Sequence, residues 1–90
     1  MIRFLRISEI VTVTGVSQAG IYRKIKDGVF PEPVRNGSAW TAWPEHEVDS
    51  INRAILSGKS VAQIKEIVTE LVASRASAYD DKASNVGAGG

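Results

Sequence analysis

The chain has one histidine, His46, and it stands between two acidic residues, Glu45 and Glu47. An imidazole beside carboxylates is the material of general acid–base catalysis and of metal binding. Consecutive positions of a helix point in different directions, however, so these side chains do not converge; the two acids instead suit a helix N-terminus. The chain has no cysteine, no glycine-rich phosphate loop opening a helix, and no serine arranged with a histidine and an acid. The sequence therefore predicts no enzyme, no metal, no cofactor and no small-molecule substrate.

Basic residues are concentrated in the first half of the chain. Residues 1–43 carry six Lys or Arg against three Asp or Glu, whereas residues 44–90 carry five against seven. The net charge of +1 hides this asymmetry. A basic half suits a polyanionic ligand such as nucleic acid. No apolar stretch approaches the length of a membrane span and the N-terminus lacks a signal peptide, so we expect a cytoplasmic protein of the bacterial nucleoid.

Two short helices are expected in this basic half. Ser8 is a suitable N-cap for the first, which Gly15 would end, although the β-branched run IVTVT also fits a strand. Ser17 caps the second, residues 18–26, and Gly28 stops it. Two short helices separated by a glycine-containing turn are typical of a helix-turn-helix motif.

A β-hairpin is expected after the helix pair. The two prolines of FPEPVR favour extended chain, and Asn36-Gly37 is a strong signal for a hairpin turn. This turn separates residues 34–35 from residues 40–43. The sequence therefore predicts a two-stranded wing beside the helices.

Two further helices are expected in the second half. The third starts at Pro44, and its apolar stripe consists of Val48, Ile51 and Ile55. The fourth opens with a capping box of Ser60 and Gln63 and extends to about residue 78. Gly58 separates the two.

The fourth helix presents a broad apolar face, whose spacing Arg75 continues. An isolated helix of this length is marginal in water, so the face needs a partner. It can fold back on the third helix of its own chain, pair with a second copy in a homodimer, or do both along its two edges. The residues predicted for dimerisation are Val61, Ile64, Ile67, Val68, Leu71 and Val72.

The segments FLRISEI, TGVSQAGIYRKIKDGVFPEPV and AWPEHEVDSI carry a resemblance to a known family. Residues 3 to about 57 resemble the AlpA family of prophage transcriptional regulators, which are related to phage excisionases and more distantly to MerR-type proteins. The middle segment is the most specific. The resemblance implies an α+β, mostly helical fold: a winged helix-turn-helix with a two-stranded wing and a C-terminal helical extension.

The resemblance also implies that residues 18–26 form a recognition helix for double-stranded DNA. The chemistry agrees, because Gln18 can read adenine and Arg23 guanine, each with two hydrogen bonds. Ser17 and the helix N-terminus can hold a phosphate, and the Tyr22 hydroxyl can bind another. The further predicted contacts are Ala19, Lys26, Arg35, Asn36 and Ser38. The alternative is a solvated helix face in which Gln18 is idle and Tyr22 only fills the core.

The wing departs from the family pattern. Family members usually carry an arginine just before the second wing strand, where this chain has Ala39. Trp43 matches the family tryptophan and is expected in the core, whereas Trp40 faces the opposite side of the strand. Three roles stay open for Trp40: a cation–π contact with Arg35, packing on a second copy, or contact with the DNA backbone.

The sequence therefore predicts a sequence-specific DNA-binding regulator of prophage or mobile-element genes. Residues 1–58 would be the DNA-binding domain, residues 59–79 an amphipathic dimerisation helix, and residues 80–90 a disordered tail. Two alternatives remain. One is an excisionase-like architectural protein that bends DNA, and the other is a protein-interaction module that binds a host regulator through its acidic half.

Overall fold

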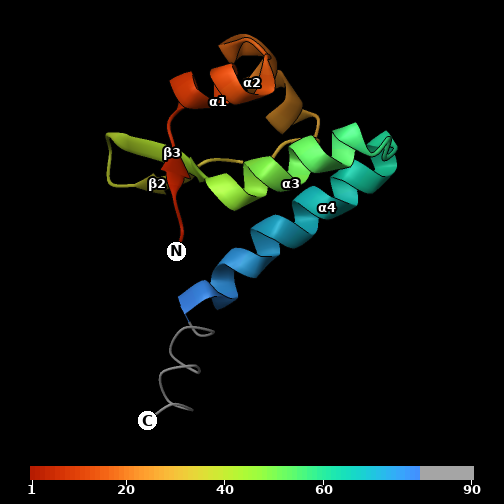
Figure 1. Ribbon diagram of the computed structural model, residues 1–90. Coiled ribbons are helices and arrows are strands. Elements are labelled where there is room, and N and C mark those ends of the chain that lie inside the picture. Colours follow the sequence, from red (N-terminus) through yellow and green to blue (C-terminus); the bar gives the residue numbers. More distant parts are fainter. Residues whose placement is uncertain (80–90) are drawn as a thin grey trace.

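Eight secondary-structure elements follow one another in the computed structural model, which describes residues 1–79 (Figure 1). In chain order they are β1 (Phe4–Leu5), α1 (Ile7–Thr14), α2 (Gln18–Lys26), β2 (Val34–Asn36), β3 (Trp40–Pro44), α3 (Glu45–Leu56), α4 (Val61–Ser74) and the 3-10 helix η1 (Arg75–Ser77). The predicted α+β, mostly helical winged helix-turn-helix with a C-terminal helical extension is confirmed. The predicted disordered tail, residues 80–90, lies outside the described residues.

The helix pair forms around a turn of three residues, 15–17. Gly15 has a φ of 71°, the left-handed conformation that ends α1, and its N–H donates back into the last turn of that helix. Ser17 caps α2, because its hydroxyl accepts the N–H of Gly20 at 3.1 Å. The predicted bounds of α2, residues 18–26, are confirmed.

The first helix begins earlier than the sequence predicted. Ser8, the predicted N-cap, lies inside α1, and the cap is Arg6. The backbone N–H of Arg6 donates to the Glu9 carboxylate at 3.1 Å, which is one half of a capping box. The reason is tertiary: the chain leaves the sheet at Leu5, so strand pairing fixes where the helix can start.

The sheet has three antiparallel strands in the order β1-β3-β2. The predicted hairpin is present, with Asn36 opposite Trp40 and a turn in which Gly37 adopts a φ of 76°. The predicted two-stranded wing is confirmed, and the structure adds a third strand to the sheet. On the other side of β3, the short strand β1 pairs Leu5 with Trp43, so β3 is the central strand.

Trp43 lies at the centre of the core, as predicted, with none of its surface exposed. Its indole N–H donates to the carbonyl of Pro31 at 2.8 Å, and its ring meets Phe30 edge to face at 6.3 Å between centroids. Trp40 faces the other way and packs edge to face against Phe4, with centroids 5.0 Å apart. Within the described chain the aromatic partner of Trp40 is therefore Phe4, a contact that was not among the three roles left open for it.

The two C-terminal helices form an antiparallel hairpin below the sheet (Figure 1). In α3, Val48 and Ile51 are buried as predicted, but Ile55 is 53% exposed and Ala54 lies in the core in its place. The predicted capping box of α4 is confirmed by reciprocal hydrogen bonds of 2.9 and 3.2 Å between Ser60 and Gln63.

A buried ion pair joins the end of this hairpin to the rest of the molecule. Glu47 is completely buried, and the Arg75 guanidinium donates to both of its carboxylate oxygens, at 2.6 and 2.9 Å. Arg75 also donates to the backbone carbonyl of Glu32 at 2.6 Å. Arg75 thus ties η1 to the start of α3 and to the loop before β2. The sequence indicated only a helix-dipole role for Glu47 and a place in the apolar stripe for Arg75.

Candidate nucleic-acid interface

One face of α2 is exposed to solvent along its whole length. The helix buries Ile21 and half-buries Ile25 against the core. The spacing of the predicted DNA contacts on this helix places them together on the opposite side. All five are exposed: Gln18, Ala19, Tyr22, Arg23 and Lys26. The face combines two side chains that can read base edges with a cation at the helix end.

The N-terminus of α2 is open to solvent at Ser17, Gln18 and Ala19. The Ser17 hydroxyl satisfies one of the unpaired N–H groups of the first turn, that of Gly20. The other N–H groups of this turn have no intrahelical acceptor, and together with the helix dipole they favour an anion such as a phosphate.

Gly20 lets the first turn of α2 pack closely against the residues of the preceding turn. The sequence did not indicate this role. A Cβ built at this position would lie 2.7 Å from Cγ1 of Val16 and 3.2 Å from the Ser17 hydroxyl. Val16 is half-buried against the core and its β-branched side chain has little rotamer freedom, so it cannot move aside freely.

Replacing Gly20 with alanine is expected to destabilise the protein by about 1–3 kcal/mol, as overpacking does, although alanine is the better helix former. Chemical denaturation of the variant measures the change. A control is Gly20→Ala combined with Val16→Ala, which removes the clashing atom and should recover part of the loss. A stabilised Gly20→Ala single variant would contradict the close approach.

Tyr22 lies between the exposed face and the core. Its side chain is 42% exposed, and its ring lies at 59° to that of Trp43 with centroids 6.4 Å apart. The aromatic ring therefore supports α2 against the sheet while part of the residue remains accessible. Both predicted roles, core filler and surface contact, are compatible with this position.

The wing tip carries the other predicted contacts. Arg35, Asn36 and Ser38 are all exposed on the β2–β3 hairpin. Arg35 is the one cation of residues 34–44, because Ala39 stands where the resemblance leads one to expect arginine. The wing can therefore supply one charged contact and a small polar tip.

The predicted dimerisation residues are divided between the inside and the outside of the molecule. Ile64 and Val68 are buried, and Ile67, Leu71 and Val72 pack against the same core. Val61, at the start of α4, is 62% exposed. Folding back on the chain's own core therefore uses most of the stripe, and pairing through α4 stays a prediction for its outer edge.

Residues 1–79 form neither a metal site nor a membrane span. No three His, Cys, Asp or Glu side chains in this part of the chain come together in a way that could hold a metal ion. Across these residues, every helix is too short or too polar to cross a lipid bilayer.

Comparison with known proteins gives one family and one curated relative. The family model described as prophage CP4-57 regulatory protein (AlpA) matches residues 3–51. The chain is 35% identical over 57 residues to the uncharacterized protein ORF88 of Enterobacteria phage P4. This match covers 63% of the chain and spans 65% of the phage protein's length. No solved structure matches the chain.

Proposed function

The chain belongs to the AlpA family of prophage regulatory proteins, and from this premise we propose that it is a sequence-specific DNA-binding regulator of prophage or mobile-element genes. The observation that carries the proposal is the exposed face of α2, which holds Gln18, Arg23 and Lys26 beside an open helix N-terminus. Such a protein would act in the bacterial cytoplasm, at the nucleoid.

Base reading is assigned to two residues of α2, Gln18 and Arg23. In helix-turn-helix proteins the N-terminal residues of the second helix contact base edges in the major groove. Gln18 lies at this end, and Arg23 lies on the same face more than one turn further along. Bidentate pairing of Gln with adenine and Arg with guanine would supply sequence choice.

Backbone contacts are assigned to the groups around this face. The N-terminus of α2 with Ser17, the partly exposed Tyr22, and Lys26 would bind phosphates, and Arg35 with the wing tip would bind the backbone outside the major groove. These contacts add affinity that depends on salt but does not depend on sequence.

Replacing Arg23 with alanine is expected to weaken binding to the specific site by about 1–3 kcal/mol and to relax the base preference at one position. Replacing Arg35 should weaken binding to all sequences and reduce the slope of log affinity against log salt by about one unit. The site is first selected from random duplexes. Both variants are then titrated against that site and a scrambled duplex at several salt concentrations.

Equal losses for Arg23→Ala on the specific and the scrambled duplex would contradict base reading by this residue. A useful control is Lys65→Ala, because Lys65 is exposed on α4, outside the proposed contacts, and its loss should leave discrimination unchanged. A gel shift on the DNA upstream of the protein's own gene and of a neighbouring integrase gene tests binding itself. Absence of any shift would favour the protein-interaction alternative.

A further inference from the structure

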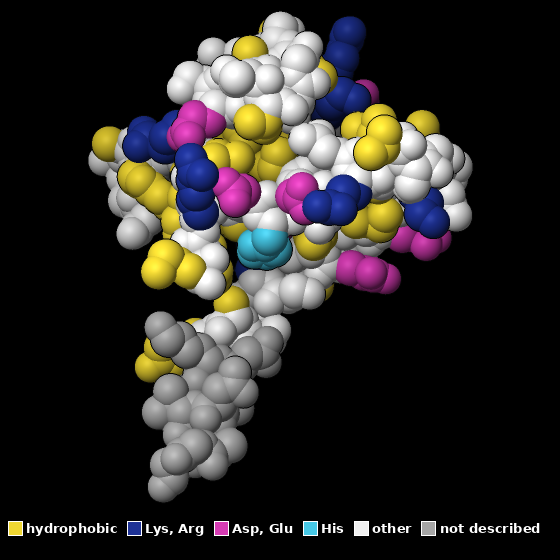
Figure 2. Space-filling view, viewed as in Figure 1, with side chains coloured by type: hydrophobic (Ala, Val, Ile, Leu, Met, Phe, Trp, Pro, Cys, Tyr) yellow, Lys and Arg dark blue, Asp and Glu magenta, His cyan; other side chains and the backbone are white. Residues whose placement is uncertain are grey.

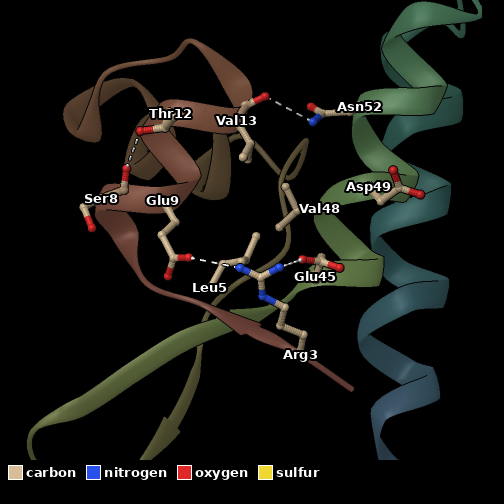
Figure 3. A pocket seen from close by; sticks show the side chains of 10 residues that line it. All are labelled: Arg3, Leu5, Ser8, Glu9, Thr12, Val13, Glu45, Val48, Asp49 and Asn52. Carbon is tan, nitrogen blue, oxygen red and sulfur yellow. Dashed lines mark hydrogen bonds and ion pairs between the residues drawn. The ribbon is translucent and has the colours of Figure 1, made fainter. Parts of the chain in front are cut away.

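A groove runs between α1 and α3, and the proposed DNA contacts take no part in it. Its volume is about 500 Å³ (Figure 3). Leu5 and Val48 are buried in its floor, and Val13, 50% exposed, stands at one end. In the space-filling view the same face is a hollow with hydrophobic atoms inside and charged side chains around it (Figure 2).

The rim of the groove is acidic. Three carboxylates line it, those of Glu9, Glu45 and Asp49, against the one guanidinium of Arg3. Arg3 lies between two of them, 3.8 Å from Glu9 and 3.3 Å from Glu45 (Figure 3). An acidic rim around an apolar floor repels the phosphates of DNA and suits a protein surface with apolar and basic groups.

The same molecule carries such a surface at the other end of α3. Leu56 is 87% exposed, the most exposed apolar side chain of the helices. It is flanked by the cations Arg53 and Lys59, both exposed. Arg53 donates a hydrogen bond to the Asp49 carboxylate, and this contact raises the pKa of Arg53 above its ordinary value, so the guanidinium remains charged. The C-terminal end of α3 and the turn to α4, which hold these residues, project at one end of the molecule (Figure 1).

The acidic groove and the projecting Leu56 share one side of α3. Glu45, Asp49, Asn52 and Leu56 follow each other at spacings of four, three and four residues, which places them along one face of the helix. The face is acidic at its N-terminal end and apolar with basic neighbours at its C-terminal end. Such a face is complementary to itself when two copies are antiparallel.

We propose that two copies of this chain pair through the α3 face about a two-fold axis, with Leu56 of each copy inserted into the α1–α3 groove of the other. The contact is isologous, the commonest arrangement among soluble homo-oligomers. Arg53 and Lys59 of one copy then approach Glu9 and Glu45 of its partner. This occupant is favoured by charge complementarity and by the exposure of an apolar side chain that nothing in the described chain covers.

The α3 pairing differs from the pairing through α4 that the sequence predicted. Most of the α4 stripe packs against its own chain, whereas the α3 face remains exposed. None of the nine residues proposed for DNA contact lines the α1–α3 groove. Pairing through α3 therefore leaves two recognition helices free for paired half-sites.

The test is sedimentation equilibrium of the full chain in the micromolar range, with Leu56→Glu and Leu56→Lys as matched variants. Wild type should be a dimer that weakens as salt is added. Leu56→Glu brings a carboxylate against the acidic rim, and it should raise the dimer dissociation constant about 30-fold or more. Leu56→Lys places an ammonium group near the acidic rim and keeps an apolar stem in the groove. It should therefore raise the dimer dissociation constant much less than Leu56→Glu does. Both variants should melt like wild type at concentrations where all are monomeric, because Leu56 is exposed.

Three results would overturn the pairing. The first is a wild type that stays monomeric throughout this range. The second is an equal loss of association in both Leu56 variants, because an acidic groove should accept the lysine variant better than the glutamate variant. The third is dissociation by Val61→Glu or Leu71→Glu with no effect of Leu56→Glu, which would support pairing through α4. A monomeric Leu56→Glu chain should still bind a single DNA half-site, so failure of the dimer is distinguishable from failure of DNA binding.

Discussion

Replacing Trp43 with alanine is expected to lower the free energy of unfolding by about 3–5 kcal/mol. A loss of this size is comparable with the whole stability of a small domain, so most of the molecules should be unfolded. Trp43 is completely buried at the centre of the core and pairs with Leu5 across the sheet. The truncation leaves a cavity between the sheet and the helices, and it leaves the Pro31 carbonyl without its donor at 2.8 Å. The rings of Phe30 and Tyr22 lose their common neighbour. Thermal and chemical unfolding measure the loss.

Trp40→Ala is the matched control for Trp43→Ala. Trp40 lies on the other face of β3, is partly exposed, and has Phe4 as its aromatic partner. Its loss should cost about 1 kcal/mol. If the Trp40 variant proved the less stable of the two, Trp40 and not Trp43 would point into the core. The register of β3 would then be shifted by one residue, because such a shift exchanges the two faces of a strand.

Removing Arg75 is expected to cost about as much as removing the central tryptophan. In Arg75→Ala the Glu47 carboxylate stays buried, with a side chain only 1% exposed, and loses both charge-assisted hydrogen bonds. Breaking a buried ion pair from one side costs about 3–5 kcal/mol, because an uncompensated charge remains in the interior. Chemical denaturation at neutral pH measures the effect.

Two comparisons make the Arg75 prediction specific. Arg53→Ala breaks an ion pair with Asp49 at 2.7 Å, but both partners are exposed, so the variant should unfold like wild type. The double variant Glu47→Leu with Arg75→Met removes both charges and should be much more stable than Arg75→Ala alone. A double variant as unstable as the single one would show that the charge left unpaired is not the cause.

The elements that depend on local chemistry could be predicted from the sequence. Ser17 and Gly15 set the ends of the two helices around the turn, Ser60 with Gln63 opened α4, and Asn36-Gly37 marked the hairpin. Each signal acts within about four residues, through a hydrogen bond or a backbone conformation. The α2 residues predicted for DNA contact lie on one exposed face for the same reason, since a helix fixes which residues share a side.

The features that depend on distant partners could not be predicted. β1 has two residues, too few for an alternating pattern, and it exists only because β3 offers a free edge. Its presence moved the N-cap of α1 from the predicted Ser8 to Arg6. Ile55 fits the apolar stripe of α3 by spacing, but the hairpin with α4 turns Ala54 inward instead. Gly20 was missed for a different reason: Val16 is only four residues away, but the clash follows from the direction of the Val16 side chain, which no sequence pattern indicates.

The order in which the ribosome delivers the chain gives the Glu47–Arg75 pair a further consequence. Glu47 is synthesised 28 residues before its partner. Until Arg75 emerges, the Glu47 carboxylate has no cation to pair with, so the final packing around it must wait for the C-terminal end of α4. A message that ends before codon 75 yields a product with this defect made permanent. Such a product is expected to unfold readily and to be degraded, because its packing depends on a contact that the last turn of α4 supplies.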